Sequence, residues 1–137
     1  MKLNSCGKLV ENEWLETAYI RTNTVLDEFI VMPNHIHAIL IIDCPTFHRD
    51  VGAYCNTPLH RQAFQSPSES IGAIVRGFKG CVTNKLHTIG LHTFAWQRSY
   101  YDHVIRNEED LLRIRQYIRY NPLKWGEDEY YNPNDLE

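Results

Sequence analysis

No run of apolar residues in this 137-residue sequence reaches the roughly 18 residues that a membrane-spanning helix requires. The first residues, MKLNSCGKLVENEW, also lack the apolar segment of a secretory signal peptide. We therefore expect a cytoplasmic protein that makes no membrane contact. The length and the 43% of apolar residues suit one ordinary core, so we expect a single domain over residues 1–137.

The four cysteines form no C-x-x-C pair. They are widely scattered, at Cys6, Cys44, Cys55 and Cys81. This spacing indicates neither a zinc ribbon nor a disulfide framework, so we expect plain reduced thiols.

The net charge of −3 gives no overall attraction to nucleic acid, but the charges are unevenly distributed. Residues 44–124 contain eleven of the fourteen Lys and Arg and six of the seventeen acids, a surplus of five positive charges. This middle segment could contact phosphate groups, although an ordinary solvated surface explains so small a surplus equally well. Charge alone leaves both interpretations open.

Hydrophobic periodicity predicts an α+β fold with one antiparallel sheet. The expected elements, in chain order, are a helix over 8–18, strands over 26–32 and 35–42, a basic amphipathic helix over 68–90, a strand over 93–105 and a helix from about 108 to 121. Residues 43–68 and the acidic tail to residue 137 lack clear periodicity, so we expect little regular structure in either.

Three short signals set the expected boundaries. Pro33 and Asn34 suit a tight turn that joins two strands as a hairpin. Asn107, which is followed by three acids, is typical of a helix N-terminus. Pro122 predicts that the last helix ends at Asn121, because proline disfavours helical geometry in the residue before it.

The segment VMPNHIHAIL, residues 31–40, places two histidines one residue apart at the start of the second expected strand. Side chains alternate between the faces of a strand, so His35 and His37 should share one face. Two imidazoles in this position can both bind one divalent ion. The alternative is a pair of solvent-exposed histidines with no function, and the H-x-H spacing alone does not exclude it.

Tyr117 and Asn121 lie four residues apart in the last expected helix and therefore share a helical face. A tyrosine hydroxyl can attack a phosphate if a metal ion neutralises that phosphate, and the amide oxygen of Asn121 could complete the metal ligands. Alternatively, Tyr117 packs in the core beside apolar residues of the same helix. Tyr120 is a competing nucleophile.

This combination of motifs resembles the single-tyrosine HUH transposases, most closely the branch of REP-associated tyrosine transposases. Members carry two histidines around one bulky hydrophobic residue, commonly in a phrase like VMPNHIH, which residues 31–37 reproduce. Their catalytic tyrosine opens a Y-I-x-x-N-P phrase in this branch, which residues 117–122 reproduce. The resemblance also includes IVRGFKGCVTNKL and WQRSYYDHVIR, and it extends over nearly all of the chain from about residue 3.

The resemblance implies a ferredoxin-like antiparallel sheet with helices packed on one face, and single-stranded DNA, often folded into a hairpin, as the partner. It implies that His35, His37 and Asn121 hold Mg²⁺ or Mn²⁺. It also implies that Tyr117 is the catalytic nucleophile, which attacks phosphorus, expels a 3′-hydroxyl and becomes a 5′-phosphotyrosine. The expected function is thus a metal-dependent single-stranded DNA endonuclease and strand transferase, a transposase associated with the nucleoid.

Basic and aromatic residues in the middle of the chain are candidates for DNA contacts. The candidates for backbone phosphates are Arg76, Lys79, Lys85 and Arg98. Tyr100 or Trp96 could stack on bases, and Trp96 could equally belong to the core. His103 could orient a ligand, the phosphate or Asp102, or be an ordinary surface histidine.

One departure from the family pattern concerns the N-terminus. Members of the branch usually begin with an additional strand before the first helix, whereas Met1 here falls almost on that helix. We therefore expect the first strand to be missing and one sheet edge to be unpaired, which a second copy of the chain could cover as a homodimer.

Two other functions compete with the transposase. The first is a catalytically silent, truncated relative that only binds DNA hairpins. The second is a small metal-dependent hydrolase of the histidine-triad kind. Ile39 argues against the hydrolase, because that position would carry a third alternating histidine.

Overall fold

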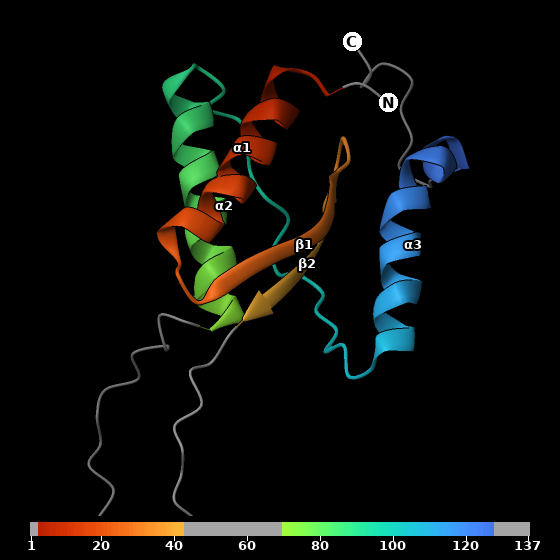
Figure 1. The fold of residues 1–137 in the computed structure, drawn as a ribbon. Helices are drawn as coiled ribbons and strands as arrows, with labels where there is room; N and C mark the ends of the chain where they lie inside the picture. The colour runs from red at the N-terminus through yellow and green to blue at the C-terminus, as the bar shows by residue number, and fades with distance from the viewer. Residues whose placement is uncertain (1–2, 43–69, 128–137) are drawn as a thin grey trace, which may run out of the picture.

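The structure of the protein is a computed structural model that describes residues 3–42 and 70–127. These residues form three α-helices and one two-stranded antiparallel sheet (Figure 1). The elements are α1 (Ser5–Ile20), β1 (Thr24–Val31), β2 (Ile36–Ile42), α2 (Ile71–Thr88), α3 (Glu108–Lys124) and the 3-10 turn η1 (Trp125–Glu127). The predicted α+β class with a small antiparallel sheet is confirmed.

Two predicted segments, the irregular excursion over 43–68 and the end of the acidic tail, lie outside the described residues. Within 3–42 and 70–127, no helix has the length and apolar character needed to cross a membrane.

β1 and β2 form the predicted hairpin. The backbone N–H of Met32 donates to the carbonyl of His35 at 2.8 Å, which leaves Pro33 and Asn34 as the two central residues of the turn. The pair of strands is therefore closed where the sequence indicates, and His35 is the first residue after the turn.

A β-bulge interrupts the hairpin near its middle. Segment 26–29 of β1 pairs with segment 38–40 of β2, so β1 has one residue more than its partner over the same length. The additional residue falls at Asp27 and Glu28. A bulge breaks the strict alternation of side chains, which allows both carboxylates to be directed toward the same side of the sheet.

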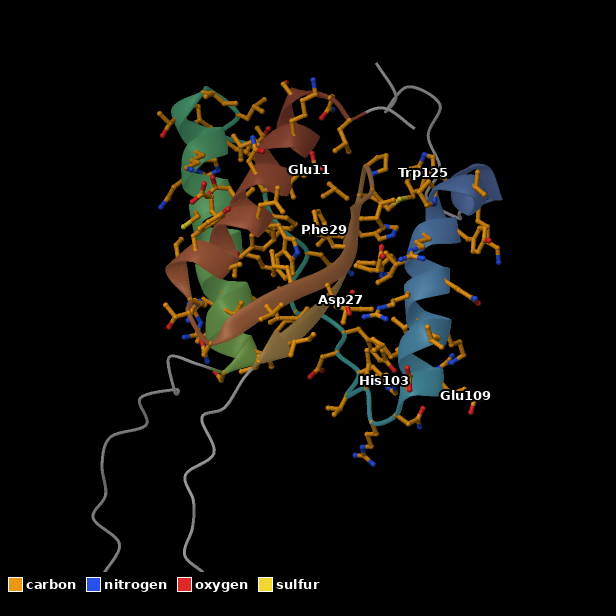
Figure 2. All side chains as sticks on the ribbon, in the orientation of Figure 1. Glu11, Asp27, Phe29, His103, Glu109 and Trp125 are labelled. Atoms are coloured by element: carbon orange, nitrogen blue, oxygen red, sulfur yellow. The ribbon has the colours of Figure 1, made fainter. Side chains whose placement is uncertain are left out.

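α1 and α2 lie side by side and cover one face of the hairpin (Figure 1). Phe29 of β1 is directed toward them (Figure 2). The core on this face is a continuous apolar cluster whose buried members are Val10, Trp14, Val31, Phe78, Val82 and Leu86. The rings of Trp14 and Phe78 meet edge to face with centroids 5.1 Å apart. Apolar packing thus joins two helices to the sheet.

α3 lies on the opposite side of the hairpin (Figure 1). Its Ile118 is buried, and Ile39 of β2, which alternates with side chains of the core face, is buried as well. α1 and α2 have the predicted placement on one face of the sheet. α3 adds a third layer on the other face, which the sequence pattern did not indicate.

Each helix begins at a polar cap. The side chains of Asn4, Ser70 and Asn107 accept hydrogen bonds from backbone N–H groups in the first turns of α1, α2 and α3. The predicted start of the last helix at Asn107 is therefore confirmed, because that cap satisfies an N–H group that the helix leaves without a partner.

The predicted strand over residues 93–105 is wrong, since this segment forms no strand in the structure. Ser99 has a φ of 71°, which breaks the extended backbone in its middle. The indole N–H of Trp96 donates to the carbonyl of Lys79, and the Lys79 ammonium donates to the carbonyls of Gln97 and Ser99. Side chains of α2, not a neighbouring strand, therefore hold this segment.

The predicted end of the last helix at Asn121 is also wrong. α3 continues through Pro122 to Lys124 and then into η1. Pro122 removes one N–H group from the last turn, while Trp125 is buried and its backbone N–H donates to the Pro122 carbonyl. Burial of the Trp125 indole offsets the tendency of Pro122 to end the helix at the residue before it.

Candidate active site

The two histidines of the hairpin are direct neighbours. His35 follows the turn and His37 lies two residues further on, in β2. Their ring centroids are 4.6 Å apart with an interplanar angle of 74°. The alternation of strand side chains thus brings the imidazoles together, as the spacing predicts.

Asn34 orients the first of these imidazoles. Its side-chain oxygen lies 2.5 Å from Nδ1 of His35. An amide oxygen only accepts hydrogen bonds, so Nδ1 of His35 is the donor in this contact. A hydrogen bond of this kind is the usual way in which a protein fixes the tautomer of a metal-binding histidine.

His37 is half-buried, and burial is the main reason why its pKa lies below the usual 6.5 of histidine, with the nearby His35 as the second cause. His37 is therefore uncharged at neutral pH. An uncharged imidazole offers the lone pair that a metal ion or a hydrogen-bond donor requires.

Tyr117 reaches the histidine pair from α3. Its ring centroid lies 5.2 Å from that of His37, and the two rings meet edge to face at 76°. The side chain of Tyr117 is 54% exposed, so the alternative in which it packs in the core is wrong. Tyr120 is exposed too, but within the described residues it makes no ring contact with His35 or His37.

Trp125 closes the other end of the site. Its ring centroid lies 6.3 Å from that of His35. Asn121 lies midway between Tyr117 and Trp125 in sequence, and residues four apart share a helical face. The stripe of α3 that faces the histidines therefore carries the Asn121 amide, although Asn121 makes no hydrogen bond to either imidazole in the part of the chain that is described.

The donors present suit a metal ion shared with a substrate better than a closed metal site. Residues 3–42 and 70–127 contain no group of three or more His, Cys, Asp or Glu that could hold an ion. His35, His37 and Asn121 would supply two imidazole nitrogens and one amide oxygen, all uncharged. Imidazole with oxygen ligands suits Mn²⁺ more than Mg²⁺, and such a set leaves positions for phosphate oxygens and water.

Two ion pairs cross from the bulge of β1 to α3. Arg115 donates to both carboxylate oxygens of Asp27, at 2.6 to 3.2 Å, and Arg119 donates to Glu28. The guanidinium of Arg115 lowers the pKa of Asp27, and that of Arg119 lowers the pKa of Glu28. Figure 2 shows Asp27 directed toward α3.

The predicted phosphate-binding residues divide into two groups. Arg76 and Arg98 are exposed and form no ion pair with another described residue. Lys79 is held by two carbonyls of the following segment, and Lys85 pairs with Glu13, which raises the pKa of the lysine. Contact of all four with DNA remains a prediction, and the first two have cations available for it.

Of the candidate stacking residues, Trp96 packs against the core. Its ring lies 5.7 Å from that of Phe78 and 5.3 Å from that of Phe94. Tyr100 is partly exposed, with its hydroxyl near Gly72 at the start of α2. Of these two aromatic residues, Tyr100 is the one available to a base.

His103 contacts a carboxylate at the start of α3. Its Nε2 lies 2.8 Å from a carboxylate oxygen of Asp110 in the first turn of α3, and His103 is the main reason why the pKa of Asp110 is lowered. Figure 2 shows His103 near the start of α3 and Trp125 at the other end. The carboxylate that His103 contacts is therefore that of Asp110, and orientation of a ligand or phosphate by His103 remains a prediction.

Four residues of this region were not identified from the sequence as part of a site: Asp27, Glu28, Asn34 and Trp125. Arginines four apart on a helix and two adjacent acids in a strand are a weak signal for a pair of ion pairs. The side-chain bond of Asn34 joins adjacent residues but has no distinctive sequence signal, and the contact of Trp125 with His35 depends on the fold.

Two proteins of Haemophilus influenzae are similar to this chain. An uncharacterised protein is 38% identical over 135 residues, which cover 96% of this chain and 72% of that protein. A protein provisionally named REP-associated tyrosine transposase is 32% identical over 99 residues, which cover 70% of this chain and 48% of that protein. The match with this second relative therefore spans about half of its length. No family model matches the chain, and no solved structure matches it.

Proposed function

Since the chain belongs to the same family as the uncharacterised Haemophilus influenzae protein, and shares 99 residues of similarity with a provisionally named transposase, we propose that it is a metal-dependent single-stranded DNA endonuclease and strand transferase. It would act in the cytoplasm, on DNA of the nucleoid. The partner would be a single strand, often folded into a hairpin.

One observation carries this proposal: the ring of Tyr117 lies against that of His37, which in turn lies against that of His35. The tyrosine comes from α3 and the histidines from the hairpin, so the fold brings together two motifs that are 80 residues apart in the sequence. A nucleophilic hydroxyl beside two imidazole rings is an arrangement suited to an attack on phosphate.

Three residues would hold the metal ion. His35, His37 and Asn121 would bind Mg²⁺ or Mn²⁺, and the ion would polarise the scissile phosphate and offset the charge that develops on it. Asn34 supports this role, because its bond to Nδ1 of His35 leaves Nε2 as the nitrogen of that ring that would bind the metal ion. The lowered pKa of His37 keeps its ring available as a ligand at neutral pH.

Tyr117 would perform the covalent step. Its phenol oxygen forms a bond to phosphorus while the bond from phosphorus to the 3′-oxygen breaks. The phenol gives up one proton and the departing 3′-oxygen takes up one, so the step is balanced. The product is a 5′-phosphotyrosine and a free 3′-hydroxyl.

The phosphotyrosine explains why a side-chain nucleophile suits strand transfer. Its ester bond retains the free energy of the broken phosphodiester, so a later 3′-hydroxyl can displace Tyr117 and rejoin strands without ATP. An activated water would release that free energy by hydrolysis. A transferase therefore needs a nucleophile such as Tyr117.

The proposal is tested by adduct formation with Mn²⁺ and a pool of fluorescent single-stranded hairpin oligonucleotides with randomised flanks. We expect a protein–DNA band that survives denaturing electrophoresis and disappears in Tyr117→Phe and in His35→Ala. Tyr120→Phe is the matched control and should retain the band. Persistence of the adduct in Tyr117→Phe would contradict the assignment. Hairpin binding without any adduct would instead identify a silent, binding-only relative.

A further inference from the structure

Few apolar side chains of α3 are fully buried. Ile118 is the one residue described in α3 that is buried, at 2% exposure. One fully buried side chain and the half-buried Leu111 and Ile114 fix the rotation of α3 about its own axis only weakly, because the hydrophobic effect is not directional. Other contacts must set how α3 is turned.

The bulge of β1 supplies such contacts. Arg115 Nε donates to Asp27 Oδ1 and Oδ2 at 3.2 and 3.1 Å, and its Nη2 donates to Oδ2 at 2.6 Å. Two parallel N–H groups on one carboxylate restrict orientation as well as distance. Asp27 is 15% exposed and Arg115 is 32% exposed, so this pair is partly protected from water.

The second pair is weaker by the same criteria. Both bonds from Arg119 reach one oxygen of Glu28, and Arg119 is 61% exposed. An exposed pair with one accepting atom contributes little to stability or to orientation. The Asp27–Arg115 pair is therefore the main polar restraint on α3.

The restraint and the nucleophile lie on opposite flanks of α3. At 100° per residue, Arg115 lies about 60° to one side of Ile118 and Tyr117 about 100° to the other side. Ile118 thus lies between the two, with the ion pair on one flank and the phenol on the other. Any roll of α3 that stretches the ion pair also moves Tyr117 relative to His37.

We propose that Asp27 and Arg115 are positioning residues that fix the rotation of α3 and so hold Tyr117 against His37. The catalytic consequence rests on the proposed function, whereas the geometric statement does not. At the helix surface, about 5–6 Å from the axis, a roll of ~10° moves a side chain by about 1 Å. A displacement of that size costs on the order of 100-fold in rate when it misplaces a reacting group.

The test measures the ring contact directly in the full chain. In protein labelled at the aromatic carbons of His and Tyr, a nuclear Overhauser cross-peak should join the rings of His37 and Tyr117. Asp27→Asn should weaken this cross-peak about threefold, because a displacement of about 1 Å at a separation near 5 Å has that effect on a sixth-power dependence. Arg115→Lys should weaken it too, since lysine retains the charge but not the two-point geometry.

Glu13→Gln is the matched control. It breaks the ion pair between Glu13 of α1 and Lys85 of α2, on the other side of the hairpin from α3. We expect this variant to keep the wild-type cross-peak between Tyr117 and His37. If Asp27→Asn does not fold, Arg115→Lys decides alone. Full cross-peak intensity in folded Asp27→Asn and Arg115→Lys would show that the Asp27–Arg115 pair has a merely structural role. This result would overturn the proposal.

A second readout separates this inference from the proposed function. Asp27→Asn should slow adduct formation about 10- to 100-fold, while the dissociation constant for the same hairpin pool changes less than about twofold. Glu13→Gln should leave the rate of adduct formation unchanged. Failure of the wild-type chain to form any adduct would refute the proposed function, and the cross-peak would still decide whether the ion pair positions Tyr117.

Discussion

The two faces of the hairpin are covered in different ways. α1 and α2 pack on one face through large apolar side chains, among which Val82 and Leu86 are completely buried. α3 covers the other face through one buried side chain, two ion pairs and contacts between aromatic and imidazole rings. The first face supplies the stability of the fold, and the second supplies directed contacts around exposed chemical groups.

The largest effect is expected from the core face. Phe78→Ala removes a buried ring that contacts both Trp14 and Trp96 and should lower the free energy of unfolding by about 3–5 kcal/mol. Urea denaturation followed by circular dichroism measures this loss. A loss below about 1 kcal/mol would contradict the assignment of stability to this face.

A smaller and more local effect is expected from the α3 face. Ile118→Ala removes the buried residue of α3 and should cost about 2–3 kcal/mol, mainly in docking of that helix. Amide hydrogen exchange should become faster throughout α3 and remain slow in β1 and β2. Equal acceleration in all elements would show that the two faces form a single cooperative unit.

A substitution on α2 tests whether the core layer also touches substrate. Arg76→Ala removes an exposed cation without an ion-pair partner among the described residues. If Arg76 contacts a phosphate, the loss should lower affinity for single-stranded DNA severalfold and reduce the salt dependence of binding by about one charge. Lys8→Ala, an exposed cation on α1, is the control and should leave that dependence unchanged. Identical salt slopes for wild type and Arg76→Ala would show that Arg76 contacts no phosphate.

The smallest effect concerns protonation on the α3 face. Burial lowers the pKa of His37, so in metal-free protein its ring should titrate below 6.5. As the pH falls below 6.5, the unfolded chain takes up this proton before the folded chain does, and stability should fall with it. Above 6.5 the group has no effect on stability. NMR titration of the His37 ring measures the midpoint, and a value at or above 6.5 would contradict the environment described here.

The core face was the more predictable of the two. Periodic apolar residues indicate α2, and the turn at Pro33 and Asn34 indicates the hairpin, because both signals are local. The strand predicted over 93–105 was wrong, because this segment packs on α2 and Ser99 interrupts its extended backbone. A local pattern does not reveal which partner a segment will find.

The site was predictable in part. The spacing of His35 and His37 indicates a shared strand face, and the structure has their rings in contact. The contact of Tyr117 with His37 required two segments to meet and was accessible only through the family resemblance. The hydrogen bonds that Arg115 donates to Asp27 depend on the β-bulge, and no residue of β1 predicts that bulge.

The most direct test of the central claim identifies the residue that becomes attached to DNA. Trypsin cleaves after Arg115 and Arg119, so it places Tyr117 in the peptide QYIR and Tyr120 in the separate peptide YNPLK. After reaction with Mn²⁺ and the hairpin pool, nuclease digestion and mass spectrometry, the account predicts a nucleotide on QYIR alone. A nucleotide on YNPLK, or on no tyrosine peptide of an adduct that does form, would contradict the proposal that Tyr117 is the nucleophile.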